Sequence, residues 1–215
     1  MGRKTSAYSC RVRGSNVGHL LFVGLPTAER GRRVAEGLLG SSLNSGWGLR
    51  TLAAGEARFA VALLLLGLTV DELVALREGD LAADGVNLQI GGPARRTLAL
   101  PAWLAAGRPA PTGAPDTPLL RDASGAALGA ADVESMLACA ALDAGLAASA
   151  GVSAEALRHT AIAWLVRQGL RFSELAGLVG RPSAEALAWY AELAPAGPKR
   201  GLAEIDPLMP ALRQG

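Results

Sequence analysis

The first strong pattern along the chain is a mostly apolar stretch that ends at a glycine. Residues 54–66 are largely apolar, and the apolar run from Phe59 to Val70 spans 12 residues. A membrane-spanning helix needs about 20 such residues, so no membrane span is expected. The pattern predicts a buried helix over 54–66 that stops at Gly67. A second helix should begin at Val70 or Asp71, because acidic residues in a first turn suit the helix dipole.

Between residues 80 and 101 the pattern changes to a period of two. Leu88 and Ile90 alternate with polar neighbours, and residues 97–100 alternate again. The Gly91-Gly92-Pro93 segment between them is typical of a turn, so we expect a small β-hairpin or meander. Residues 107–118 (GRPAPTGAPDTP) form a proline-rich connector with no core of its own.

Helical periodicity dominates the rest of the chain. Ser153, Ser183 and other cap or stop residues bound four expected helices at about 130–145, 153–168, 171–179 and 183–193. Before residue 50 we expect a short strand or buried turn at 19–23, a helix at 27–39 and a loop at 40–48. The tail from Pro195 holds an apolar pair, Leu208-Met209, suited to docking on this chain or on another.

These elements predict a mainly α fold with a small antiparallel β-sheet, of the α+β class. We divide the chain into a basic N-terminal arm with a short helix (1–49), a central domain (50–194) and a C-terminal tail (195–215). The composition agrees, since 50% of the 215 residues are hydrophobic but only 4% are aromatic. The core must therefore be built from Ala, Leu and Val, and disorder is excluded for most of the chain.

The near-neutral net charge of +2 conceals an asymmetry. Residues 1–33 carry seven basic residues against Glu29 alone, a net charge of +6. Residues 34–215 carry 14 bases and 18 acids, a net charge of −4. A basic arm on an acidic body indicates a polyanion or an acidic protein as partner, and the alternative is a merely solvated arm.

Cysteines and histidines are too few for a metal site. Cys10 and Cys139 make no metal-binding pair, and with only His19 and His159 no zinc site is expected. Unpaired cysteines are typical of a reducing, cytoplasmic compartment. The glycine-rich loop at 40–48 lacks the GK[ST] ending of a phosphate loop, so neither a nucleotide nor another cofactor is expected.

Four segments occur in an order and spacing found in one known family. They are 66–80 (LGLTVDELVALREGD), 96–101 (RTLALP), 151–160 (GVSAEALRHT) and 178–183 (LVGRPS) followed by Tyr190. The segments resemble the TGLRxSELxxLRWxD, KxRxVPL, VSPHxLRHT and LLGHSS…Y elements of the tyrosine recombinases, or phage integrases. The nine-residue interval from Arg181 to Tyr190 equals the family's interval from its second histidine to its tyrosine. The resemblance covers about residues 50–193 and implies the recombinase catalytic-domain fold.

The resemblance also implies roles for individual residues. In that family a tyrosine attacks a DNA phosphodiester, two arginines hold the phosphate oxygens, and a lysine with histidines or a tryptophan handles protons. Arg158 matches the second arginine and Tyr190 the nucleophile. His159 matches a histidine whose family role is mainly structural. The first arginine, the hairpin lysine and the two histidines are replaced by Thr69, Gly91, Glu155 and Arg181.

Four such substitutions predict very slow strand cleavage. One lost donor to a developing anion costs about 10²–10³ in rate, and acid–base catalysis supplies about 10²–10⁴. We therefore expect a degenerate recombinase-like protein, unable to cleave DNA by itself, that binds DNA or a recombination partner. One alternative is a non-enzymatic interaction or scaffold module that reuses the fold. Another is an active recombinase with a rearranged site.

Basic residues outside the substituted positions are the expected contacts to DNA or a partner. They are Arg11, Arg13, Arg30, Arg32, Arg33, Arg95 and Arg96. Arg158 and Tyr190 also have a structural interpretation, in which Arg158 pairs with Glu155 or a helix end and Tyr190 packs beside Trp189. Because C-terminal helices of this family dock on neighbouring protomers, the resemblance also makes a homo-oligomer through the tail an expectation.

Overall fold

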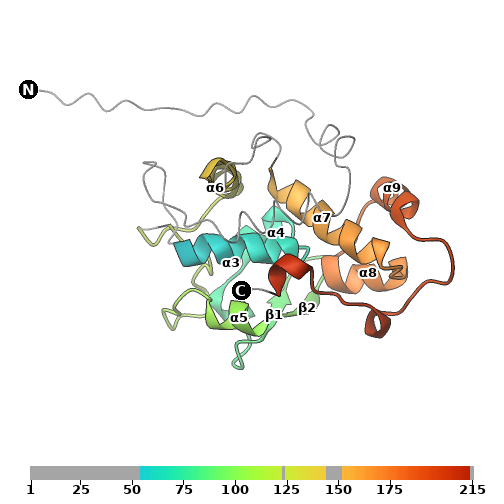
Figure 1. Cartoon of the computed structure of the whole chain (residues 1–215). Helices are drawn as coiled ribbons and strands as arrows, with labels where there is room; N and C mark the ends of the chain where they lie inside the picture. The colour runs from blue at the N-terminus through green and yellow to red at the C-terminus, as the bar shows by residue number, and fades with distance from the viewer. Residues whose placement is uncertain (1–53, 123, 144–151, 214–215) are drawn as a thin grey trace, which may run out of the picture.

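The centre of the molecule is formed by two helices that pack against each other. The computed structural model describes residues 54–122, 124–143 and 152–213, so the predicted elements before residue 50 lie outside the described residues. Helices α3 (Ala54–Leu65) and α7 (Ala154–Arg167) pack against each other (Figure 1). Residues 59–65 of α3 are almost completely buried. The buried helix predicted from the apolar run is therefore confirmed.

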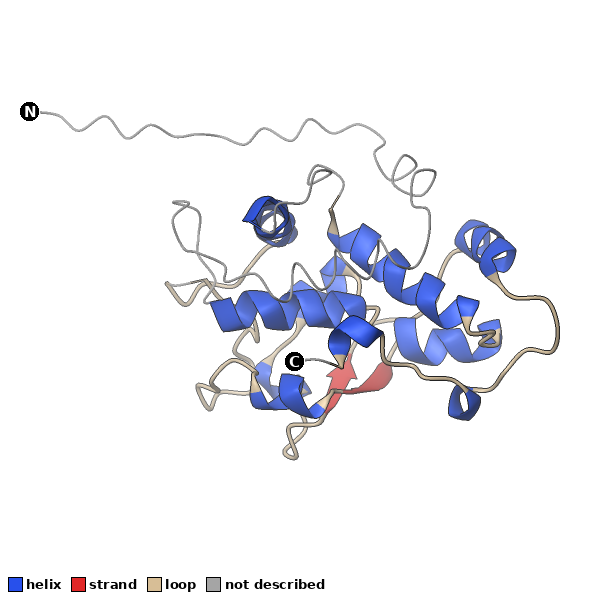
Figure 2. Ribbon diagram, in the orientation of Figure 1, coloured by secondary structure: helices blue, strands red, loops and turns tan. Residues whose placement is uncertain are grey.

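The predicted hairpin lies on one side of α3. After α4 (Val70–Ala75) and a 3₁₀ turn, η1 (Glu78–Asp80), the strands β1 (Asn87–Ile90) and β2 (Arg96–Ala99) pair antiparallel. They form the two-stranded sheet drawn in red in Figure 2, and α5 (Ala102–Ala106) follows it. Both strands alternate buried and exposed residues, as the period of two predicted.

The other helices begin and end close to the predicted residues. They are α6 (Ala130–Asp143), α8 (Phe172–Val179) and α9 (Ala184–Leu193), with 3₁₀ turns η3 (Leu202–Glu204) and η4 (Pro210–Leu212) in the tail. Ser153 and Ser183 cap α7 and α9 by accepting hydrogen bonds from Ala156 N and Ala186 N. The described part of the chain is thus mainly helical with one small antiparallel sheet, which confirms the predicted fold class.

Polar contacts help to hold the proline-rich connector at 107–118 in place. The Glu78 carboxylate accepts hydrogen bonds from the backbone nitrogens of Thr112 and Gly113 and from the Thr112 hydroxyl. Arg121 forms an ion pair with the same carboxylate at 3.2 Å. These contacts attach the connector to the turn after α4.

The apolar core has two parts. The larger part surrounds α3 and the hairpin, and the smaller part lies between α7, α8 and α9. Met209 and Leu212 of the tail are buried in the larger part, and the Trp103 indole donates a hydrogen bond to the Leu212 carbonyl. The tail therefore docks on its own chain, one of the two expected outcomes, while a homo-oligomer stays a prediction. None of the described helices is long and apolar enough to cross a membrane.

Candidate functional site

Arg158 is a buried side chain that joins two helix ends. It lies on α7 and is only 8% exposed. Its Nε donates a hydrogen bond to the Gly67 carbonyl at 3.1 Å, and its Nη2 donates to the Val179 carbonyl at 2.8 Å. Gly67 follows α3, and Val179 is the last residue of α8. The guanidinium thus makes the contact with helix ends that the structural interpretation of Arg158 described.

Arg96 makes a matching contact from the hairpin. Its Nε donates to the Leu178 carbonyl at 3.0 Å, and its two terminal nitrogens bind the Glu72 carboxylate at 2.6 and 2.9 Å. Only 3% of the Arg96 side chain is exposed. Arg96 was expected to contact DNA or a partner, and this burial corrects that expectation. Its alternation with Leu98 on β2 turns it toward the core.

The last two carbonyls of α8 therefore each accept a hydrogen bond from a buried arginine. The carboxyl end of a helix carries partial negative charge and unpaired carbonyls, and cations stabilise it. Arg96 reaches this end from β2 and Arg158 from α7. We call the set formed by Glu72, Arg96, Arg158 and the α8 carboxyl end the arginine cluster. It connects elements that carry all four sequence segments quoted above.

Thr69, at the position of the family's first arginine, caps a helix. Its hydroxyl accepts a hydrogen bond from Glu72 N, and the Glu72 carboxylate accepts one from Thr69 N, which forms a capping box at the start of α4. Burial raises the pKa of Glu72, but the bonds from Arg96 and Thr69 and the charge of Arg158 more than offset it. The pKa of Glu72 is therefore below its ordinary value.

Glu155, His159 and Tyr190 form a chain of hydrogen bonds beside the arginine cluster. His159 Nε2 lies 2.7 Å from the Glu155 carboxylate, and His159 Nδ1 is hydrogen-bonded to the Tyr190 hydroxyl. The hydrogen bond to His159, with a contribution from the charge of Arg158, lowers the pKa of Glu155 against the effect of burial. His159, and not Arg158, is thus the hydrogen-bonding partner of Glu155.

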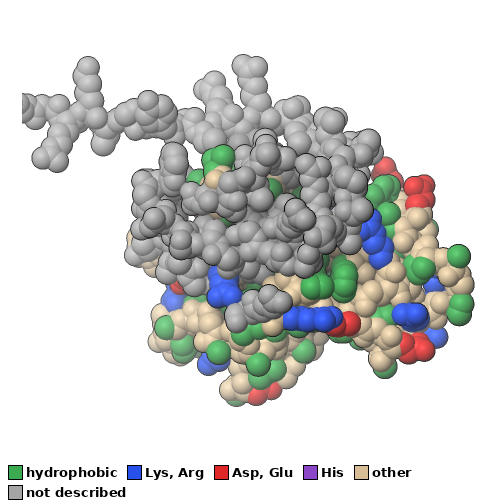
Figure 3. Space-filling model, viewed as in Figure 1, with side chains coloured by type: hydrophobic (Ala, Val, Ile, Leu, Met, Phe, Trp, Pro, Cys, Tyr) green, Lys and Arg blue, Asp and Glu red, His purple; other side chains and the backbone are tan. Residues whose placement is uncertain are grey.

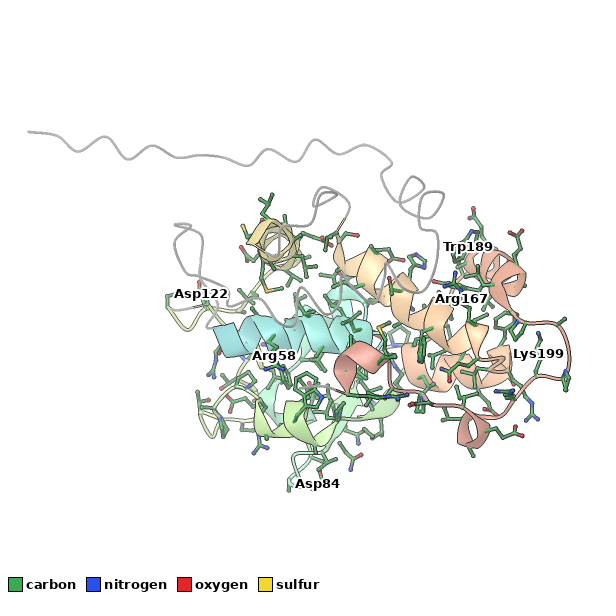
Figure 4. All side chains as sticks on the ribbon, viewed as in Figure 1. Arg58, Asp84, Asp122, Arg167, Trp189 and Lys199 are labelled. Atoms are coloured by element: carbon green, nitrogen blue, oxygen red, sulfur yellow. The ribbon has the colours of Figure 1, made fainter. Side chains whose placement is uncertain are left out.

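Tyr190 is enclosed between α7 and α9. It is 0% exposed, and its ring contacts Trp189 edge-on with 5.1 Å between the centroids. Figure 4 labels Trp189 on α9, on the same side of the molecule as Arg167 of α7. Burial, with a smaller contribution from Glu155 and against Arg158, raises the pKa of the Tyr190 phenol well above its ordinary value. A phenol in this position is a poor nucleophile.

The remaining candidate positions lie apart from these contacts or outside the described residues. Gly91, Arg95 and Arg181 are exposed, the first two at the hairpin turn and the third just after α8. Arg11, Arg13, Arg30, Arg32 and Arg33 lie outside the described residues. On the coloured surface in Figure 3, blue basic and red acidic side chains are interspersed.

Sequence reasoning missed Glu72 as the partner of Arg96 and the pairing of Glu155 with His159. A signal existed for the second, because Glu155 and His159 are four residues apart on one helix and such positions face each other. For the first, extending the alternation of residues 97–100 back by one residue would have turned Arg96 inward, where an arginine needs an acidic partner.

A comparison with solved structures found the same fold in a known protein. No family model matches the chain, and no curated protein matches its sequence. The crystal structure of the XerA recombinase superposes with a TM-score of 0.58 at 15% sequence identity, over 79% of this chain and 62% of that one. The chain has a tyrosine-recombinase fold. At 15% identity the likeness concerns the fold alone, and the match spans less than two thirds of the XerA chain.

Within this recombinase fold the arginine cluster and the neighbouring Glu155 are together balanced in charge. The positive charges of Arg96 and Arg158 stand against the carboxylates of Glu72 and Glu155, and the charge of Arg158 lowers the pKa of both acids. A phosphate approaching Arg158 would meet a guanidinium already bonded to two carbonyls and flanked by two carboxylates. The geometry suits a structural centre better than an anion-binding one.

Proposed function

We propose that this chain is a recombinase-fold protein that does not cleave DNA and acts by binding duplex DNA, alone or with a recombination partner. The observation that carries the proposal is the state of Arg158, whose guanidinium is buried and donates to the Gly67 and Val179 carbonyls. The resemblance gives this arginine the task of holding a phosphate. A guanidinium engaged in the core does not perform that task.

The chemistry around Tyr190 supports the loss of cleavage. Its hydroxyl is buried and bonded to His159, and its pKa is raised by burial. An attacking phenol needs nearby cations or a base to lose its proton, and a matching acid to protonate the leaving group. Thr69 caps a helix, and Gly91 has no ionisable side chain. Each missing donor or acid costs about 10²–10⁴ in rate.

DNA binding without cleavage rests on the charge of the N-terminal arm. Residues 1–33 carry a net charge of +6, and DNA affinity comes largely from neutralised phosphates and released counterions. Among the described residues, Arg95 and Arg181 are exposed and can add to these contacts. Arg96 and Arg158 are withdrawn from this role by burial.

The cleavage half of the proposal can be tested with nicked suicide duplexes of randomised sequence. We expect no covalent protein–DNA adduct above the level of the matched control Tyr190→Phe. An adduct that forms with the wild-type protein and disappears with Tyr190→Phe would overturn this half. Such a result would favour the active recombinase with a rearranged site.

The binding half can be tested by gel shift on duplex DNA at two salt concentrations. We expect retardation at ~50 mM salt that weakens steeply by ~200 mM. Replacing Arg11, Arg13, Arg30, Arg32 and Arg33 by alanine should reduce the slope of log K against log[salt] by about 4–5 if each neutralises one phosphate. No retardation at the lower salt would contradict DNA binding.

The negative net charge of residues 34–215 favours a second function, that of a protein-interaction module. Residues 34–215 have a net charge of −4, and the Glu155 side chain is 61% exposed where the family places a histidine near phosphate. Both features repel a polyanion. A stoichiometric protein partner that survives nuclease treatment, together with an absent gel shift, would favour this function over the first.

A further inference from the structure

The contacts of His159 set the direction of a hydrogen-bonded chain. The pKa of Glu155 is lowered, so its carboxylate accepts hydrogen bonds and cannot donate one. The proton of the 2.7 Å contact must therefore lie on His159 Nε2. In the neutral imidazole, Nδ1 then has a lone pair and accepts the proton of the Tyr190 hydroxyl.

The three residues differ sharply in exposure. The Glu155 side chain is 61% exposed and that of His159 is 20% exposed, whereas Tyr190 is 0% exposed. Glu155 and His159 lie on α7, and Tyr190 lies on α9. The chain therefore runs from solvent to a buried phenol and crosses from one helix to the other.

We propose that Glu155 and His159 form a latch that holds the Tyr190 hydroxyl inward and fixes α9 against α7. Glu155 acts as a positioning residue, because its hydrogen bond selects the Nε2–H tautomer and the ring orientation of His159. His159 then gives the buried hydroxyl the acceptor that it needs. The latch goes beyond the proposed function, because it concerns the state of the tyrosine and involves no DNA.

Opening the latch should expose a reactive phenol. Without the Glu155 contact, the imidazole can rotate or adopt the other tautomer, and the Tyr190 hydroxyl then loses its acceptor. Loss of one hydrogen bond of ordinary strength raises the population of the open state about tenfold. Charge near Tyr190 also changes, since Glu155 and Arg158 both act on its phenol.

Acetylation of the phenol oxygen by N-acetylimidazole measures this exposure in the full-length protein. The peptide that contains Tyr190 is quantified by mass spectrometry, which separates it from Tyr8. We expect Glu155→Ala to raise the acetylation rate of Tyr190 about tenfold. Glu155→Gln keeps an acceptor oxygen and should restore most of the protection. Glu185→Ala, an exposed acid on α9, is the matched control and should leave the rate unchanged.

Two acetylation results would overturn the latch. One is equal acetylation rates in the wild type, Glu155→Ala and Glu185→Ala. The other is a rise with Glu155→Ala that Glu155→Gln does not reduce, because the hydrogen bond is then not the cause. Imidazole ¹⁵N NMR provides an independent measurement, in which neutral His159 should be the Nε2–H tautomer in the wild type. The Nδ1–H tautomer would contradict the proposal. Neither measurement uses DNA, so its failure is distinct from a failure of the proposed function.

Discussion

Arg158 shares a face of α7 with Ala161, Ile162 and Leu165, and all four are buried. The spacing of three, four and seven residues is that of one helix face, so the position of Arg158 in the core was readable from the sequence. Its partners were not, because the Gly67 and Val179 carbonyls come from distant segments. The family resemblance implied a phosphate role for a residue whose helical phase indicated burial.

Removing the Arg158 guanidinium should destabilise the protein strongly. Arg158→Met keeps the apolar stem but leaves the Gly67 and Val179 carbonyls without this donor. It also removes a positive charge that stabilises the carboxylates of Glu72 and Glu155. We expect a loss of about 2–4 kcal/mol in the free energy of unfolding. Urea denaturation followed by circular dichroism measures it. Arg181→Met, at an exposed position, should stay within about 0.5 kcal/mol of the wild type, and equal effects of the two variants would refute the argument.

Glu72 should make the stability of the protein depend on acid pH. Its pKa is lower in the folded state than in the unfolded chain, where it is near 4.5. Its contribution is therefore present above about pH 4.5 and is lost as the pH falls through the lower, folded value. Glu72→Gln should be less stable at pH 7 by about 1–3 kcal/mol and should lose stability less steeply below pH 4.5. Parallel pH profiles for the two proteins would contradict this assignment.

At the scale of elements, periodicity and caps made the helices and the hairpin predictable. Ser153 and Ser183 cap the helices that the sequence placed there, and Leu88 and Leu98 face each other across the predicted hairpin. The course of residues 107–118 was not predictable, because Glu78 holds this segment through backbone hydrogen bonds that leave no pattern in its own sequence.

The junction between α3 and α8 depends on a glycine. Gly67 has φ +97°, and a Cβ on it would lie 2.3 Å from Val179 Cγ1. Gly67→Ala therefore adds a left-handed backbone penalty to a steric overlap, and we expect a loss of about 2–4 kcal/mol in stability. Gly177→Ala on α8, where a Cβ meets nothing within 4 Å, should instead raise stability by about 0.5–1 kcal/mol. Thermal unfolding of both variants checks the opposite signs, and a neutral Gly67→Ala would show that the junction can relax.

At the scale of the whole molecule, the arginine cluster lies where the two parts of the core meet. Arg158 connects the end of α3, in the larger part, with α8, in the smaller part. In a recombinase fold this region is where the resemblance places the phosphate-binding residues. Here Arg96 and Glu72 form a buried ion pair in this region, Arg158 donates to two backbone carbonyls, and Thr69 caps a helix. The contacts of Arg158 therefore hold the two parts of the core together.

The C-terminal tail closes the larger part of the core, which leads to a prediction about assembly. Leu212 is 0% exposed on its own chain, and its carbonyl accepts the indole hydrogen bond of Trp103. Leu212→Ala should cost about 2–5 kcal/mol in stability, because a buried leucine leaves a cavity. If the tail acts only within its own chain, the oligomeric state of the folded variant stays that of the wild type. Light scattering combined with urea denaturation measures both quantities. A change in oligomeric state with little loss of stability would instead assign Leu212 to a contact between copies, as the family resemblance implied for the tail.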